Sequence, residues 1–308
     1  MKYFLLSLCL SGVLLAFFPA PVRACDVCGC SVGGSYLGIL PQFSRNFAGL
    51  KYKYRSFGFA GVLPAHEGEV MPLEDQFQTW EAWGRFHLGK KWQLFAFVPV
   101  SQNLRVLESG NTRLRGIGDA SLMAYYSLLN TGDSAKHVWK HNLMAGGGVK
   151  MPTGKYQQRN ADYELLPQAF QLGSGAYSFS ANVNYTVRYK KMGLNTEFQY
   201  RKSSYNELQY RFGDQISAAA TFFYWKNVRR FTFLPNVGLF AEKIGQDFQY
   251  KVHVAETGST NLYATAGVET YYKRLALGLS VQQPLKQQVS EYQPRSRSRL
   301  SANVSVLF

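Results

Sequence analysis

Apolar and polar residues alternate with a period of two along most of this 308-residue chain. Between residues 177 and 189, odd positions carry Tyr, Phe, Ala and Val, and even positions carry Ser, Asn, Thr and Arg. Successive side chains of a β-strand point to opposite faces, so this segment predicts a strand with one apolar and one polar face. The alternation recurs near residues 50–55, 79–88, 92–104, 116–129, 140–150, 194–201, 216–224, 231–243, 261–272, 274–284 and 299–308.

These segments predict about twelve strands of roughly ten residues, the length that a tilted strand needs to cross a bilayer. A soluble sandwich fits less well, because open sheets rarely exceed ~10 strands without splitting. The chain is 15% aromatic and only 17% charged. After the first two dozen residues, no apolar run approaches the roughly 20 residues of a spanning helix. We therefore predict an all-β fold, a transmembrane antiparallel up-and-down β-barrel.

The links between the predicted strands alternate in length. Barrels of this class have short periplasmic turns and longer outer loops, which places both termini in the periplasm when the strand count is even. The C-terminal Phe308, which closes an alternating strand, resembles the signal that bacterial outer-membrane proteins present to the barrel-assembly machinery. We expect the outer membrane of a Gram-negative-type bacterium as the location. The short links are 89–91, 130–139, 190–191, 226–230 and 273–274, and the long links are 60–75, 151–175, 202–212, 244–260 and 285–296.

The N-terminal 24 residues are typical of a signal peptide, with a basic start, an apolar stretch and small residues before a cleavage site after Ala24. We expect a periplasmic extension at 25–48 and the barrel at 49–308. The extension begins with Cys25, Cys28 and Cys30. Thiolates at this spacing could bind Cu or Zn, two of them could form a disulfide, or Cys25 could be lipidated. The sequence leaves these alternatives open.

Two glycine-containing motifs resemble a known family of membrane barrels. Residues 116–122 read Gly-Ile-Gly-Asp-Ala-Ser-Leu, and residues 146–154 read Gly-Gly-Gly-Val-Lys-Met-Pro-Thr-Gly. Together with Phe97-Val98-Pro99, they resemble the meta-pathway phenol-degradation family of outer-membrane barrels. The resemblance covers about residues 95–200, and it implies a transporter without implying particular site residues. From the residues themselves, the glycines indicate close backbone approach and tight turning at strand ends.

The chain carries 34 Lys and Arg against 19 Asp and Glu. Several basic residues have the parity of the lumen face, and closure of the barrel would bring the first and last strands together. Such a basic strip would favour anions, as rings of Arg or Lys do in anion pores. Alternatively, the basic residues pair with Glu81, Glu197 and Glu269 and brace the barrel. The expected strip is Lys51, Lys53, Arg55, Arg295, Arg297 and Arg299, and Arg85, Arg188 and Arg201 share its parity.

The sequence contains no arrangement typical of an enzyme, such as a His near a nucleophilic Ser or clustered Asp and His. The five histidines, His66, His87, His137, His141 and His253, form no metal-binding pattern and are interpreted as ordinary polar residues. No recognition helix accompanies the positive charge, which argues against nucleic acid as a partner. The function that we predict is passage of a small solute across the outer membrane, with outer-membrane lipid as the surrounding partner. The alternative is a structural or partner-binding barrel whose N-terminal cysteines serve a metal or redox site.

Overall fold

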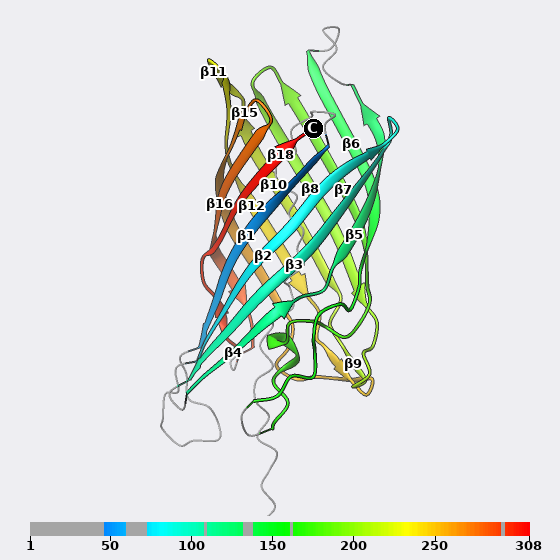
Figure 1. Ribbon diagram of the computed structural model, residues 1–308, viewed down its shortest axis with the longest axis vertical. Coiled ribbons are helices and arrows are strands. Elements are labelled where there is room, and N and C mark those ends of the chain that lie inside the picture. The colour runs from blue at the N-terminus through cyan, green and yellow to red at the C-terminus, as the bar shows by residue number, and fades with distance from the viewer. Residues whose placement is uncertain (1–45, 60–72, 108–109, 132–137, 161–162, 291–292) are drawn as a thin grey trace, which may run out of the picture.

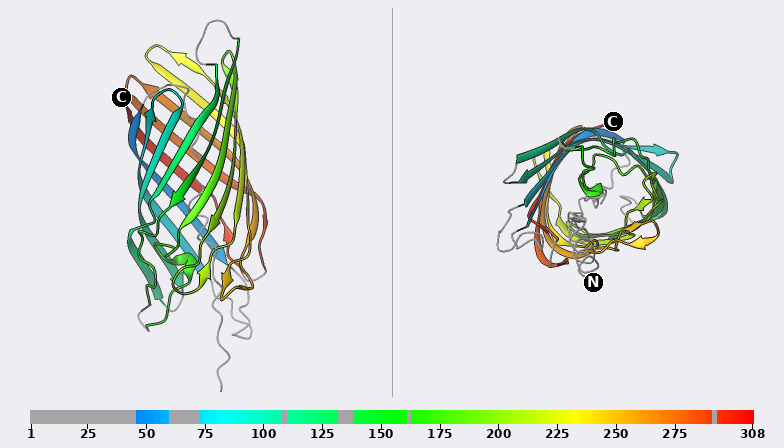
Figure 2. Two further views of the ribbon diagram at one scale, coloured as in Figure 1. Left: turned by 90° about the vertical axis from the view of Figure 1, so that its right-hand side faces the viewer. Right: turned by 90° about the horizontal axis from the view of Figure 1, so that it is seen from below.

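The computed structural model describes residues 46–59, 73–107, 110–131, 138–160, 163–290 and 293–308. These residues form a closed antiparallel barrel, which the right-hand view of Figure 2 shows from one end. The first strand pairs with the last, and Lys51 lies opposite Asn303 at this seam. The predicted fold class is thereby confirmed, and the signal peptide and most of the N-terminal extension lie outside the described residues.

Twelve strands build the barrel wall. Each strand coincides with a segment in which the sequence alternates between apolar and polar residues. The alternation arises because the two faces of the wall meet different surroundings. In chain order they are β1 (Phe47–Phe59), β2 (Leu73–Leu88), β3 (Trp92–Leu107), β5 (Ser121–Asn130), β6 (Trp139–Lys150), β7 (Ser178–Tyr189), β8 (Met192–Ser203), β10 (Gln215–Tyr224), β12 (Phe231–Ile244), β15 (Ser259–Tyr272), β16 (Leu275–Gln288) and β18 (Arg299–Leu307).

The two ends of the barrel differ, as Figure 1 shows. At one end lie the short turns 89–91, 190–191 and 273–274 together with the C-terminus. We call this the short-turn end, and the opposite end the long-loop end. The predicted alternation of short and long links is therefore present. Smaller elements extend the two ends, namely β11 (Lys226–Val228) at the short-turn end, and β4 (Gly110–Ile117), β9 (Tyr210–Arg211), β13 (Phe248–Gln249), β14 (Val252–His253) and β17 (Arg295–Ser296) at the long-loop end.

One strand of the wall is interrupted. β4 pairs with the C-terminal half of β3, and β5 pairs with its N-terminal half. Gly118, Asp119 and Ala120 lie between β4 and β5 and belong to neither strand. Among the described pairings β4 has no second neighbour, whereas β5 also pairs with β6. The segment 151–177 follows β6 and turns into the barrel, where it forms the short helix η2 (Gln168–Phe170). The sequence motif Gly118-Asp119 therefore marks the point at which the regular wall ends.

The outer face of the wall is apolar. On β16, Leu275, Leu277 and Leu279 are exposed, while Ala276 between the first two is buried. On β7, Phe179 and Val183 are exposed while Asn182 and Asn184 are buried. A belt of exposed apolar side chains on a closed barrel matches the surface that meets lipid in outer-membrane proteins. The predicted assignment of the apolar faces to the outside holds for these strands.

Among the described residues, no helix is long and apolar enough to cross a membrane.

Candidate functional site

The lumen of the barrel is lined mainly by polar side chains that bond to one another. Asn195 donates hydrogen bonds to Asn184 and Thr186, and Gln199 donates one to Asn182. The hydroxyls of Ser178 and Ser203 lie 2.9 Å apart. Buried polar groups need such partners, because leaving one unsatisfied costs about 1–3 kcal/mol. This network is the polar face that the alternation predicts.

An apolar layer crosses the lumen nearer the short-turn end. Rings of Phe47 and Trp83 lie 4.5 Å apart, Phe95 and Tyr125 lie 5.5 Å apart, and Leu234 is 0% exposed. These side chains have lumen parity, so the sequence pattern of apolar residues outside and polar residues inside fails at this level. The layer therefore narrows the lumen with packed apolar side chains at this level. Its members are Phe47, Trp83, Phe95, Phe97, Met123, Tyr125, Met144, Phe223, Leu234, Tyr271, Ala276 and Leu307.

The segment 151–177, which we call the inserted segment, narrows the lumen at the long-loop end, where η2 lies within the barrel outline in Figure 2. Phe170 of η2 is fully buried and contacts the ring of Phe77 on β2. The guanidinium of Arg105 lies 4.8 Å from the centre of the Phe170 ring. Asn103 donates a hydrogen bond of 2.7 Å to the Phe170 carbonyl. The inserted segment is therefore packed against the wall through apolar, cation–π and hydrogen-bond contacts.

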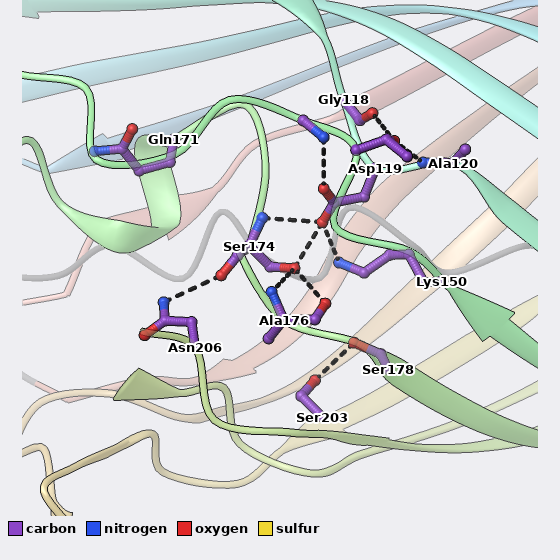
Figure 3. Close-up of polar contacts among 12 residues, drawn as sticks. Gly118, Asp119, Ala120, Lys150, Gln171, Ser174, Ala176, Ser178, Ser203 and Asn206 are labelled. Atoms are coloured by element: carbon purple, nitrogen blue, oxygen red, sulfur yellow. Dashed lines mark hydrogen bonds and ion pairs between the residues drawn. The ribbon is translucent and has the colours of Figure 1, made fainter. Parts of the chain in front are cut away.

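Asp119 holds both ends of the inserted segment, as Figure 3 shows. Its Oδ2 accepts hydrogen bonds from the backbone N–H and the hydroxyl of Ser174, at 2.9 and 2.6 Å. Its Oδ1 accepts one from the N–H of Gly154 at 3.1 Å, and Lys150 Nζ lies 3.2 Å from Oδ2. Thr153 completes the arrangement, because its hydroxyl donates to the Gly118 carbonyl and accepts from the Ala120 N–H. We call these residues the Asp119 cluster.

Two glycines let the ends of the inserted segment touch. A Cβ on Gly173 would lie 2.3 Å from the carbonyl oxygen of Gly154, and a Cβ on Gly154 would lie 2.7 Å from the Gly173 Cα. No larger residue fits at either position without movement of the backbone. The sequence motifs at 116–122 and 146–154 therefore come together in space and form one structural unit. Their pairing, and the role of Asp119, could not be deduced from the sequence.

A cavity lies between the apolar layer and the inserted segment. Its empty space is ≈ 1150 Å³, which includes a part that is open to solvent. Phe97 of the apolar layer lines it, as do Gln168 and Leu172 of the inserted segment. Its charged lining residues are Lys53, Arg55, Lys150, Arg201, Glu81, Asp119 and Asp247. The cavity is therefore a hollow of the lumen whose described walls carry both positive and negative side chains.

Ion pairs join several of the lumen charges. Lys53 pairs with Glu81 at 2.9 Å, and Arg105 Nε lies 2.7 Å from Asp75 Oδ1. Arg299 pairs with Glu242 at 2.7 Å near the long-loop end. The lumen therefore contains ion pairs that brace the barrel and, in addition, an excess of positively charged side chains. Among the lumen charges on the described strands outside these pairs and the pair of Lys150 with Asp119, the basic residues outnumber Glu197 and Glu269; they are Lys51, Arg55, Arg85, Lys140, Arg188 and Arg201.

The residues of the predicted basic strip lie on both faces of the wall. Lys51, Lys53, Arg55 and Arg299 face the lumen, and the ammonium of Lys51 lies 3.9 Å from the centre of the Trp83 ring.

Arg295 and Arg297 face outward instead. Arg295 lies opposite Gly58 on the outer face, and Arg297 Nη1 lies 3.7 Å from the outward Glu74. The predicted strip assumes that side chains alternate between the two faces without interruption from 295 to 299. Ser296 and Arg299 are both buried, however, and the two residues between them are both exposed. An extra residue of this kind is a bulge, and it shifts every later side chain to the other face.

The predicted cysteine site lies outside the described residues, as do His66 and His137. Among the described residues, no group of three or more His, Cys, Asp or Glu could hold a metal ion. The backbone N–H of His87 donates a hydrogen bond to Asn46 Oδ1, a ring nitrogen of His141 bonds to the Tyr185 hydroxyl, and His253 lies against Phe248. These three histidines thus have ordinary polar or ring contacts.

The COG4313 outer membrane channel from Pseudomonas putida F1 superposes with a TM-score of 0.64 at 14% sequence identity, over 89% of this chain and 98% of that one. The chain folds as an outer-membrane β-barrel. The β domain of the Bordetella autotransporter BrkA gives a TM-score of 0.48 at 10% identity, over 86% and 99%, and is too distant to carry an argument.

No family model and no curated protein sequence matches the chain. Membership of the phenol-degradation family therefore stays a hypothesis. What the comparison supports is the barrel fold, which this chain shares with a channel.

Proposed function

We propose that this barrel is a non-enzymatic outer-membrane channel for a small polar solute. The observation that carries the proposal is the cavity inside the lumen, which is lined by polar and charged side chains and bounded by the inserted segment and the apolar layer. The similarity in fold to the COG4313 channel supports the same class of function.

Passage of a solute through the lumen requires movement of both the inserted segment and the apolar layer. The inserted segment is held by the hydrogen bonds of the Asp119 cluster, which exchange readily with water once the loop moves. The apolar layer contains side chains rather than backbone, so rotamer changes can open it, as in hydrophobic constrictions that gate channels by excluding water. In this proposal the solute enters past the inserted segment, rests in the cavity and leaves through the apolar layer.

The proposed solute is an anion. Arg55 and Arg201 line the cavity, and Lys51 lies next to it on the same face of β1. Cations on the walls of a narrow, low-dielectric passage raise the local concentration of anions. The phenol-degradation resemblance would instead suggest an aromatic solute, and Phe77 and Phe212 are aromatic lining residues of the cavity.

Conductance across a planar bilayer tests this proposal. We expect channel openings whose reversal potential in a salt gradient shows anion preference. The double substitution Arg55→Gln and Arg201→Gln should weaken that preference, because it removes lumen charge. The matched control is Arg295→Gln with Arg297→Gln, which removes the same charge from the outer face and should leave the preference unchanged. A cation-selective wild-type channel would contradict the anion part of the proposal.

A structural or partner-binding barrel is the second candidate function. The observation that favours it is the apolar layer, whose side chains pack against one another as in the core of a soluble domain. Absence of any conductance, both in the wild-type protein and in a variant with a thinned apolar layer, would favour this candidate over the channel.

A further inference from the structure

The carboxylates on the described strands are distributed unevenly between the two faces of the wall. Of the acidic side chains there, Glu74 alone faces outward. The others have lumen parity, because each lies opposite a lumen residue of a neighbouring strand. They are Asp75, Glu81, Glu197, Glu242 and Glu269. The outer face of the strands is therefore almost free of negative charge.

Exposed Lys and Arg lie in the turns of the short-turn end. A second set lies at the long-loop end of the described wall, at outward positions on the strands or next to them. Lys202 is the next-to-last residue of β8, and Lys243 is the next-to-last residue of β12. Each is exposed and lies beside a lumen residue, so it points away from the lumen. We call the whole set the basic girdle. It consists of Arg113, Arg115, Lys202, Lys243, Lys286, Arg295 and Arg297, all exposed and contributed by β4, β8, β12, β16, β17 and the residue that follows β17.

The basic girdle follows the edge of the apolar belt. On β16 the exposed Leu275, Leu277, Leu279 and Val281 precede Lys286 along the strand. The hydrocarbon core of a bilayer ends where the charged headgroups begin. Outward-facing side chains at the edge of the apolar belt therefore lie at the level of the lipid headgroups.

Arg297 shows how the wall accommodates one member of the girdle. A Cβ on Gly58 would lie 2.8 Å from Arg297 Nη2, so the guanidinium lies directly over the outer face of β1. The side chain of Arg297 is 60% exposed, and its nearest carboxylate oxygen, on Glu74, is 3.7 Å away. Five N–H donors in a planar fork suit the oxygens of a phosphate group. Only part of that donor capacity is directed at Glu74.

We propose that the basic girdle binds the phosphate groups of the glycolipid in the outer leaflet, that is, of phosphorylated lipid A. Charge complementarity and position support this partner. The girdle is cationic, borders the apolar belt and lies at the end with the long loops, which we expect outside the cell. Basic residues near a membrane surface are attracted to anionic lipids. The proposal concerns the outer surface and is independent of what the lumen conducts.

Lipid retention by the folded, full-length protein tests the proposal. The protein is exchanged into a neutral detergent, mixed with bisphosphorylated lipid A, with its dephosphorylated form or with phosphatidylglycerol, and examined by native mass spectrometry. We expect bisphosphorylated lipid A to be retained most strongly. The substitution of Arg113, Arg115, Arg295 and Arg297 by Gln should weaken its retention at least about tenfold.

The matched control removes four cations from the opposite margin, in the turns that hold Lys190, Lys191, Lys273 and Arg274. This variant should retain lipid A as the wild-type protein does. Equal losses in the two variants would overturn the proposal, since any cation would then serve. Wild-type protein that retains dephosphorylated lipid A or phosphatidylglycerol as strongly would overturn it as well, without requiring any variant to fold. The conductance experiment reads the lumen and does not depend on either result.

Discussion

Asp119 accepts two hydrogen bonds from Ser174, a residue that lies 55 positions further along the chain. Asp119 interrupts a wall strand, whereas Ser174 belongs to the segment that enters the lumen. Lys150, at the end of β6, lies against the same carboxylate. One side chain therefore joins the wall of the barrel to the element that narrows its lumen, and several expected outcomes depend on this contact.

Replacement of Asp119 by Ala should release the inserted segment. The change removes the acceptor for Ser174 and Gly154 and leaves Lys150 without its ion pair, so we expect a loss of about 2–4 kcal/mol in the local closure. Limited trypsin digestion of the folded protein is the measurement, since Lys155 and Arg159 are exposed cleavage sites within the segment. Asp214→Asn, which alters a carboxylate bonded to Tyr200 elsewhere, is the control. Unchanged digestion in Asp119→Ala would contradict the assigned role.

Replacement of Gly173 by Ala should also disturb the inserted segment, by a steric route. The new Cβ would lie 2.3 Å from the Gly154 carbonyl oxygen, and overpacking of this kind costs about 1–3 kcal/mol. Gly245→Ala is the matched control, because the atoms nearest to its Cβ would be at ordinary contact distances of 3.5 and 3.6 Å. Denaturant unfolding of both variants in lipid vesicles should show a lower midpoint for Gly173→Ala alone.

Thinning of the apolar layer should increase conductance. Trp83 contacts Phe47 and Phe97 within the lumen, so the double substitution Trp83→Ala and Phe95→Ala removes much of the closure. We expect the open-channel conductance to rise at least about twofold, because water and ions enter a wider and less apolar constriction. Trp80→Ala is the control, since Trp80 is on the same strand but faces outward. Equal conductance in the two variants would place the ion path elsewhere.

Stability should depend on pH through Asp247, which lies in the loop between β12 and β15. Burial raises the pKa of this carboxyl, although Tyr210 and Gly213 donate hydrogen bonds to it. Above the ordinary Asp pKa of 3.8 the unfolded chain has released its proton, whereas the folded protein still holds it. The free energy of unfolding should therefore fall as pH rises through the window between 3.8 and the raised pKa, and level off above it.

The measurement is a series of denaturant unfolding curves across that pH range for the wild-type protein and Asp247→Asn. The Asn variant lacks the titrating group at position 247. Its free energy of unfolding should therefore not show the part of the decline with rising pH that Asp247 causes, while the other groups still titrate. The same slope in both proteins would show that Asp247 does not contribute.

Topology can be tested with single cysteines placed at Gln158 and Lys190. Gln158 lies in a long link and Lys190 in a short turn at the opposite end of the barrel. An impermeant thiol reagent applied to whole cells should label position 158 and leave position 190 unlabelled, because long loops face outward in barrels of this class. Labelling of position 190 alone would reverse the orientation and would also remove the basis for lipid A as the partner of the basic girdle.

The sequence by itself predicted the barrel, because about twelve alternating segments are more than an open soluble sheet usually holds, whereas a closed barrel gives every strand one lipid-facing and one lumen-facing side. It predicted the faces of β7 and the pairing of the first and last strands, and it marked Gly118-Asp119 and Pro152-Thr153-Gly154 as unusual. Only the tertiary structure decided that these motifs meet, because the contact between Asp119 and Ser174 is set by how the chain folds back into the lumen. Likewise, a bulge between Ser296 and Arg299 turned Arg295 and Arg297 outward, and aromatic residues such as Phe95 and Tyr125 filled one level of the lumen. Local alternation records the parity of a strand, whereas bulges and long-range packing decide which face each side chain finally occupies.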